Sequence, residues 1–248
     1  MNTGRNIIKV RNIDRIAGRL FTYGHFFHDC LMPEVNLGLL NYTKIYRLNT
    51  IDQRIGVFSE IYKLFGVETI EVNPEKFAKI ECDLKNVSAY NCNGFKQHHI
   101  IKLKNFVESK LNVTAEVGVD IVLIKRGFQK LLKNIHIDTG GMLREISQID
   151  VLEKKLKNNG FDVKTVVLED INWESQVKLF KSAKLVIGAH GAGLCNIAFC
   201  DKGTDILEVN FSKCKTFSRI SNLVGLNYHL VDDSVANIIN LVKKIKKR

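Results

Sequence analysis

The residues best suited to chemistry in this sequence form a glycine-rich segment in its second half, from Val186 to Asn196. Its apolar start predicts a buried strand that ends at Gly188, after which small residues allow a tight turn into a helix. The first N–H groups of such a helix bind phosphate, and glycine lets a pyrophosphate approach the backbone. His190 lies at the mouth of the turn, where its imidazole can donate to a phosphate or sugar oxygen. The pattern predicts a phosphate site, although a plain glycine-rich turn with a hydrogen-bonded histidine fits it equally.

A second candidate pair, His25 and Asp29, lies near the start of the chain in the segment YGHFFHDCLMP over residues 23–33. A spacing of four puts both side chains on one face of a helix, close enough to hydrogen-bond. Such a pair can act as a general base with the partner that orients it. The alternative is a pair that only caps or stabilises a helix at the surface.

These residues must be positioned by an α/β fold, because strand and helix patterns alternate along the chain. The patterns predict strands over 43–48, 68–72, 86–90, 120–124, 161–168, 185–188 and 205–209. They predict helices over 53–65, 103–111, 149–159, 175–181 and 194–199. We therefore expect two Rossmann-type domains, residues 1–115 and 116–248, with a cleft between them and a junction within 94–119.

The composition is that of a globular protein of 248 residues, 45% hydrophobic and 25% charged. A formal net charge of +11 points to an anionic partner, which could be a nucleic acid, a membrane surface or a nucleoside diphosphate. The basic run over 243–248 indicates the solvated end of a helix, with peripheral lipid or nucleic-acid contact as alternatives. No RNP-like or zinc-finger pattern accompanies the scattered lysines, which disfavours a nucleic-acid-binding protein.

The six cysteines show no Cys-x-x-Cys pair and no zinc-like spacing with histidine. We therefore expect free thiols, no structural metal and no bound cofactor. The sequence shows no signal-peptide pattern and no apolar run of roughly 18 residues, so we expect no membrane-spanning helix. These features together predict a reducing, cytoplasmic setting in a bacterium or a virus-infected cell.

The segment from 120 to 232 resembles the family 61 glycosyltransferases in the order and spacing of its motifs. They are Ile124-Lys125-Arg126 at a strand end, QVKLFKSA over 176–183, HGAGLCN over 190–196 and Leu207-Glu208 in a later strand. The YGHFFHDCLMP segment is similar to the family's Tyr-x-His-Phe-x-x-Asp-x-Leu-Pro pattern, with the proline displaced by one position. The sequence departs from the family after Arg144, where the usual Asn-Glu pair is replaced.

The resemblance implies a GT-B-like fold and an inverting, metal-independent transfer, in agreement with the absence of an Asp-x-Asp motif. The donor is then a nucleotide-sugar, with UDP as the implied nucleotide, and the acceptor is a hydroxyl of a glycan or glycoprotein. Without a divalent ion, cations and backbone donors must stabilise the leaving diphosphate. The donor-binding residues expected are Arg126, Arg144, His190, Gly191, Ala192, Gly193, Leu194, Asn196 and Glu208.

Particular roles follow for four of the candidate residues. Asp29 or His25 is expected to deprotonate the acceptor hydroxyl, because an inverting transfer needs one base. Glu208 is expected to bind the ribose hydroxyls, with a surface position at a strand end as the alternative. Asn196 is expected either to contact the donor or to tie the glycine-rich turn.

Three other interpretations stay open. The missing Asn-Glu pair allows a catalytically degenerate relative that binds a glycan or a nucleotide. The net charge alone favours a basic nucleic-acid-binding protein. A nicotinamide-dependent oxidoreductase is disfavoured, because the glycine-rich motif comes late and is not a Gly-x-Gly-x-x-Gly after the first strand.

Overall fold

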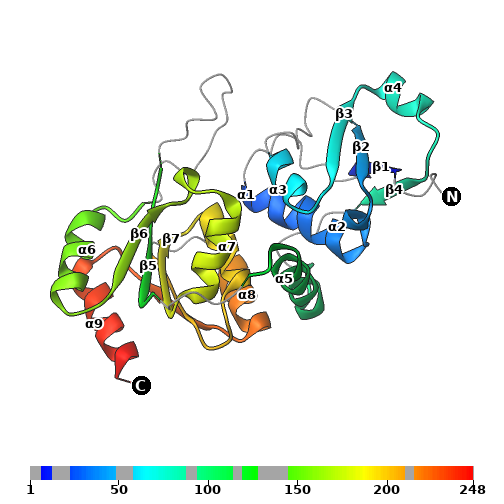
Figure 1. The fold of residues 1–248 in the computed structure, drawn as a ribbon. Helices are drawn as coiled ribbons and strands as arrows, with labels where there is room; N and C mark the ends of the chain where they lie inside the picture. Colours follow the sequence, from blue (N-terminus) through cyan, green and yellow to red (C-terminus); the bar gives the residue numbers. More distant parts are fainter. Residues whose placement is uncertain are drawn as a thin grey trace. The chain divides into compact units, whose positions relative to one another are not determined.

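The computed structural model describes residues 7–12, 23–48, 58–87, 94–113, 119–127, 145–209 and 215–247. The chain divides into two compact units, Met1–Asn112 and Val113–Arg248. Each unit contains one sheet, and every strand pairing described in either sheet is parallel (Figure 1). Parallel neighbours need crossover connections, and helices supply them here. The predicted α/β class is therefore confirmed.

The first unit holds a four-stranded sheet in the order β3-β2-β1-β4. Its strands are β1 (Ile7–Asn12), β2 (Lys44–Leu48), β3 (Glu68–Val72) and β4 (Leu84–Val87). Its later helices are α3 (Ser59–Leu64), α4 (Pro74–Lys79) and α5 (Gln97–Leu111). This strand order is that of one Rossmann half, in which the direction of winding reverses between β1 and β4.

The helix after β1 changes its winding along its length. It comprises α1 (Tyr23–His25), the π-helical η1 (Phe26–Leu31) and α2 (Met32–Asn36), and the short 3₁₀ turn η2 (Leu39–Asn41) follows. Pro33 has no N–H to donate to the carbonyl of Asp29, so the α-helical pattern of hydrogen bonds is interrupted there. The preceding residue, Met32, donates its N–H to the carbonyl of Phe27, five residues back, which is a π-type bond. All six residues of the π-helical turn are buried.

The second unit holds a five-stranded sheet in the order β6-β5-β7-β8-β9. Its strands are β5 (Ile121–Lys125), β6 (Val163–Val167), β7 (Leu185–Ala189), β8 (Asp205–Val209) and β9 (Asn227–Val231). Its helices are α6 (Ile149–Asn158), α7 (Trp173–Ser182), α8 (Thr216–Val224) and α9 (Val235–Lys246), with the 3₁₀ segments η5 (Leu168–Asp170) and η6 (Ala192–Phe199). This is the flavodoxin-like order, and its winding reverses between β5 and β7.

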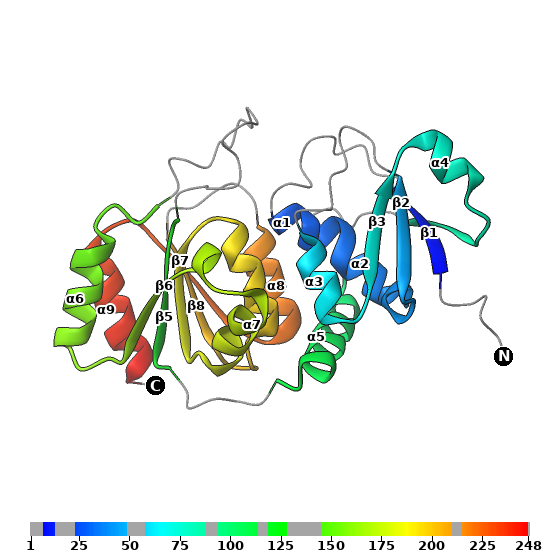
Figure 2. The same ribbon diagram turned by 45° about the horizontal axis from the view of Figure 1, so that its top comes forward.

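Both faces of the second sheet are covered. Figure 2 shows α6 and α9 on one side and α7 and α8 on the other. A core cluster joins alternate residues of β5, β7 and β8, such as Ile121 and Leu123, to apolar residues of α6 and α9, such as Leu152 and Ile238. Because side chains alternate between faces, Val122 faces the opposite layer and is equally buried. Burial on both faces explains the continuous apolar runs of these strands in the sequence.

The predicted elements agree with the observed ones in most places. Strands β3 and β8 have the predicted bounds, whereas the helix expected over 53–65 is described only from Phe58 onward. Helix α5 occupies much of the expected junction and belongs to the first unit.

None of the helices in the described ranges is long and apolar enough to cross a membrane. Cys30, Cys195 and Cys200 are buried free thiols, and Cys82 is a half-buried one.

Candidate functional site

The glycine-rich turn connects β7 to η6. Its His190 N–H donates to the carbonyl of Val209 (3.2 Å), which fixes the turn against the end of β8. The first helical bond of η6 runs from the Leu194 N–H to the Gly191 carbonyl (3.0 Å). The N–H groups of Ala192 and Gly193 precede that bond and so have no partner within the helix. The Leu194 side chain is buried and its N–H is used inside the helix. A donor contact of Leu194 stays a prediction.

Two glycines of this segment have little room for a side chain. A Cβ on Gly193 would lie 2.7 Å from Leu168 Cδ1, and a Cβ on Gly188 would lie 3.0 Å from Ile124 Cδ1. Gly191 differs, because a Cβ there would meet only the Ala189 carbonyl oxygen at 3.8 Å and an arginine nitrogen at 3.9 Å. The backbone at Gly191 is therefore open to a group of at least one methyl in size.

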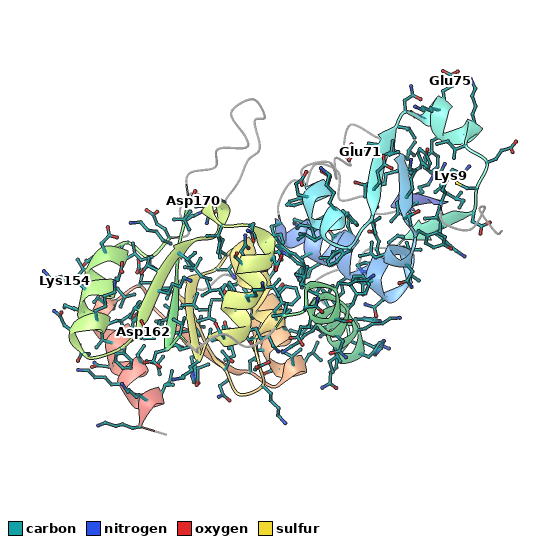
Figure 3. All side chains as sticks on the ribbon, viewed as in Figure 1. Lys9, Glu71, Glu75, Lys154, Asp162 and Asp170 are labelled. Atoms are coloured by element: carbon teal, nitrogen blue, oxygen red, sulfur yellow. The ribbon has the colours of Figure 1, made fainter. Side chains whose placement is uncertain are left out.

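The nearby arginine nitrogen is Nη1 of Arg126, an exposed residue that follows β5. Strands β5 and β7 are neighbours, and the winding of the sheet reverses between them. Ligands of open parallel sheets bind at such a reversal, outside the carboxyl ends of the strands. Figure 3 helps to locate this edge, since Asp170 follows β6 at its carboxyl end and Asp162 precedes β6 at the other. The structure thus brings Arg126 and the predicted turn together, while Arg144 lies outside the described residues.

His190 belongs to a buried cluster that sequence reasoning found only in part. Its Nδ1 is hydrogen-bonded to Oε1 of Glu208, and the Tyr228 hydroxyl donates to Oε2 of Glu208 (2.6 Å). Glu208 is 1% exposed and His190 is 7% exposed, so the alternative of a surface position for Glu208 is wrong. The His190 ring also packs on Phe217 of α8, with ring centroids 4.9 Å apart. A contact between Glu208 and a ribose stays a prediction.

Burial, with the hydrogen bond and charge of Glu208, raises the pKa of Tyr228. The hydroxyl therefore keeps its proton and is the donor to the carboxylate. Tyr228 was not singled out from the sequence, because it lies on β9, a strand at the edge of the sheet that was not predicted.

Asn196 is fully buried and connects elements around the turn. Its Nδ2 donates to Oε1 of Gln176 on α7 (2.8 Å). The Gln176 Nε2 donates in turn to the carbonyl of Leu168 (2.8 Å), the residue that packs on Gly193. Asn196 thus ties η6, which follows the glycine-rich turn, to α7. A contact with the donor stays a prediction.

The second candidate pair lies on the helix that follows β1. His25 Nδ1 and Asp29 Oδ2 are 2.9 Å apart, which confirms the predicted hydrogen bond. Asp29 is 5% exposed, whereas 32% of the His25 side chain is exposed. Because β1 and β2 are parallel, the helix between them must begin near the carboxyl edge of the sheet.

Behind this pair lies a buried ion pair that the sequence did not indicate. Arg47 of β2 donates two hydrogen bonds to Glu34 of α2 (2.6 and 2.8 Å), and the Tyr62 hydroxyl donates a third (2.7 Å). Glu34 and Tyr62 are fully buried, and Arg47 is 2% exposed. These three hydrogen bonds offset part of the cost of burying two charges, although Nε of Arg47 is buried without a hydrogen-bond partner. The cluster fixes the helix that carries His25 to β2 and α3.

Within the ranges that the structure describes, no three acidic, histidine or cysteine side chains are arranged to hold a metal ion.

Fold and site together define an α/β protein with a glycine-rich turn at the reversal point of a parallel, Rossmann-like sheet. Comparison with known families makes this class specific: the sequence profile of the Glycosyltransferase 61 family matches residues 23–207. That match covers more than half of the chain, so the chain belongs to the glycosyltransferase 61 family, as the resemblance implied. The matched span includes His25, Asp29, Arg126 and the glycine-rich turn, and it ends one residue before Glu208.

One curated relative supports the same assignment. The beta-1,2-xylosyltransferase of Oryza sativa subsp. japonica is 32% identical over 84 residues. The similar region covers 31% of this chain and only 16% of the length of that protein.

Proposed function

We propose that this chain transfers a sugar from a nucleotide-sugar, of the UDP class, to a hydroxyl of a glycan or glycoprotein acceptor, with inversion at the anomeric carbon. The observation that carries the proposal is the position of Arg126 beside Gly191 at the reversal point of the second sheet. A cation and open backbone at this point suit a diphosphate. Membership of the glycosyltransferase 61 family makes a nucleotide-sugar the natural diphosphate.

The donor side supplies positive charge and hydrogen-bond donors. The guanidinium of Arg126 and the N–H groups of Ala192 and Gly193 are placed to bind the two phosphates. They stabilise the negative charge that grows on the diphosphate as it leaves, a role that a divalent ion has in other enzymes. We therefore propose a transfer that does not require a metal ion.

The acceptor side supplies the base. The buried Asp29 and the partly exposed His25 favour a division of roles, in which His25 takes the proton and Asp29 orients the ring. In one displacement, the acceptor oxygen forms its bond to the anomeric carbon while the bond from that carbon to phosphate oxygen breaks. The acceptor proton goes to His25, and the electron pair of the broken bond leaves with the diphosphate.

Nucleotide binding is the experiment that tests the donor site. Calorimetric titration of UDP, GDP, CDP and NAD, each without and with Mg²⁺, should show metal-independent binding of UDP. Replacing Arg126→Gln should weaken that binding about tenfold, the loss of one charged contact. The matched control is Lys125→Gln, because Lys125 is the preceding residue and its ammonium pairs with Asp150 (2.8 Å). Equal effects of the two variants would contradict the placement of the diphosphate.

An assay of UDP release with the same protein tests the transfer reaction. UDP release from UDP-sugars in the presence of glycan acceptors should be abolished or strongly reduced in Asp29→Asn, with UDP affinity unchanged. Wild-type binding of UDP without any sugar transfer would favour the degenerate relative. If no nucleotide binds, titration with oligonucleotides at increasing salt tests the nucleic-acid alternative suggested by the net charge.

A further inference from the structure

An exposed acidic side chain follows β6, at the same edge of the sheet as the glycine-rich turn. Strand β6 ends at Val167, and Glu169 is an exposed residue of η5. Strands β6, β5 and β7 are neighbours and parallel, so their carboxyl ends share one edge. Figure 3 marks the β6 end of this edge with Asp170, the residue after Glu169.

The Glu169 carboxylate lies against the backbone of Gly127. A Cβ on Gly127 would be 2.9 Å from Oε2 of Glu169 and 2.6 Å from Cγ1 of Val167. The absence of a side chain at Gly127 therefore lets the end of β6 come close to the residue after Arg126. Nη1 of Arg126 is in turn 3.9 Å from the position of a Cβ on Gly191. Three neighbouring strands thus present a carboxylate, a guanidinium and an open backbone at one edge, in the strand order β6, β5 and β7.

We propose that Glu169 binds the ribose of the donor nucleotide, with its carboxylate accepting a hydrogen bond from the 2′-hydroxyl. This role rests on the proposed function, in which Arg126 and the backbone at Gly191 bind the diphosphate. Glu169 then has the role that the sequence suggested for Glu208.

The surroundings of the two glutamates favour Glu169. Glu208 is 1% exposed, and its two oxygens are already hydrogen-bonded, one to His190 and the other to Tyr228. A ribose at Glu208 would have to reach a buried atom and displace one of these bonds, which leaves a buried polar group unpaired. The exposed Glu169 exchanges only water for the ribose hydroxyl, so binding there disrupts no contact within the fold.

The order of the strands along the chain supports the same assignment. In doubly wound sheets that bind nucleotides, an acidic residue that follows the first βα turn in the sequence hydrogen-bonds the ribose 2′-hydroxyl. In the second sheet β5 comes first along the chain, and it is followed by Arg126. Strand β6 comes next and is followed by Glu169. Glu169 therefore has the place of the ribose-binding acid relative to the proposed phosphate site.

Charge gives the donor a direction along this edge. A carboxylate repels a diphosphate and accepts hydrogen bonds from hydroxyl groups. With the diphosphate at Gly191, next to β7, the β6 end of the edge suits an uncharged part of the donor that carries hydroxyls. The nucleoside is then expected across the ends of β5 and β6.

Strand β6 also offers a matched control at its other end. Asp162 is exposed and immediately precedes β6, whereas Glu169 follows it (Figure 3). Replacing Asp162→Ala removes the same charge from the amino edge of the sheet. This variant should bind nucleotides as the wild type does.

The test is calorimetric titration of UDP and 2′-deoxy-UDP into the full chain, for the wild type, Glu169→Ala and Asp162→Ala. The wild type should bind UDP about tenfold more tightly than 2′-deoxy-UDP, the effect of one hydrogen bond to a charged group. Glu169→Ala should bind UDP about tenfold more weakly and should no longer distinguish the two nucleotides. Because Glu169 is exposed, its replacement by alanine leaves the core unchanged.

The outcomes separate this role from the proposed function. Loss of a negative charge near a diphosphate would by itself tighten UDP binding, which is opposite to the expected result. If Glu169→Ala binds UDP as tightly as the wild type or more tightly, the ribose contact is overturned and the donor site is not. A wild type that binds UDP and 2′-deoxy-UDP equally overturns it as well. If the wild type binds no nucleoside diphosphate, the proposed function fails and the ribose contact fails with it.

Discussion

At the scale of single residues, two histidines one helical turn apart have different surroundings. The His25 side chain is partly exposed and hydrogen-bonded to Asp29. His28 is 7% exposed, stacks on Phe95 with ring centroids 5.3 Å apart, and its Nε2 is a buried atom without a hydrogen-bond partner. Burial, and to a lesser extent the nearby His25, lowers the pKa of His28 to about 4. At neutral pH His28 is therefore an uncharged part of the core, whereas the His25 side chain is partly exposed.

His28 should make the protein less stable as the pH falls. Its pKa is about 6.5 in the unfolded chain and about 4 in the folded one. Between these values the unfolded state binds the proton more tightly, so stability is complete above the unfolded pKa and is lost as the pH falls toward the folded pKa. This group alone should remove about 2 kcal/mol between about pH 7 and about pH 5. His28→Phe should remove this part of the pH dependence in urea unfolding.

The control for this prediction is His98→Gln, which removes an exposed histidine from α5. The pH dependence of that variant should match the wild type. A wild type whose stability is flat across this range, or a His28→Phe variant with an unchanged slope, would contradict the prediction.

At the scale of elements, two glycines of the glycine-rich turn have different surroundings. Gly193 has little room for a side chain, because Leu168, which follows β6, occupies the space next to it. Gly191 has an extended backbone (φ 175°) that any residue can adopt, and it has room for a methyl group. One glycine therefore serves the fold, and the other is proposed to serve the approach of the pyrophosphate.

Two alanine substitutions should reveal this difference. Gly193→Ala should destabilise the protein by about 1–3 kcal/mol, because Leu168 must move from its buried position. Gly191→Ala should change the free energy of unfolding by less than about 0.5 kcal/mol. It should weaken UDP binding about tenfold, since the methyl would stand where a phosphate approaches the backbone. Urea unfolding and calorimetry measure both effects, and unchanged UDP affinity in Gly191→Ala would place the phosphate elsewhere.

The elements that the sequence predicted well are those with strong apolar runs, such as β5 and β8, which are buried on both faces. Strands β1 and β9 were missed for physical reasons. In β1 the buried Ile8 and Val10 alternate with the charged Lys9 and Arg11, which are half-buried and exposed. Strand β9 is an edge strand with no fully buried residue. Its conformation depends on pairing with β8, which no local pattern encodes.

At the scale of the whole molecule, strand order decides which residues meet. Local spacing predicted the hydrogen bond between His25 and Asp29, because four positions on a helix always bring side chains together. The contact of His190 with Glu208 spans 18 residues, and that of Glu208 with Tyr228 spans 20. Both exist because β7, β8 and β9 are neighbours in the sheet. The buried carboxylate was therefore predicted as a strand-end residue, and its partners were not.

The second unit should fold and bind nucleotide by itself. Its sheet contains only strands from residues 121–231, and its core cluster draws only on residues 121–245. A parallel sheet with both faces covered needs no further layer to bury its apolar residues. The proposed donor contacts, from Arg126 to Gly193, also all lie in this part of the chain.

A fragment of residues 113–248 should therefore show a single cooperative thermal transition by circular dichroism. It should bind UDP within about threefold of the full chain, and Gly191→Ala should weaken the fragment and the full chain equally, because the turn is the same in both. A fragment that unfolds without cooperativity would show that the second unit needs the first one to fold. A fragment that melts cooperatively but does not bind UDP, beside a full chain that does, would instead place part of the donor site in the first unit.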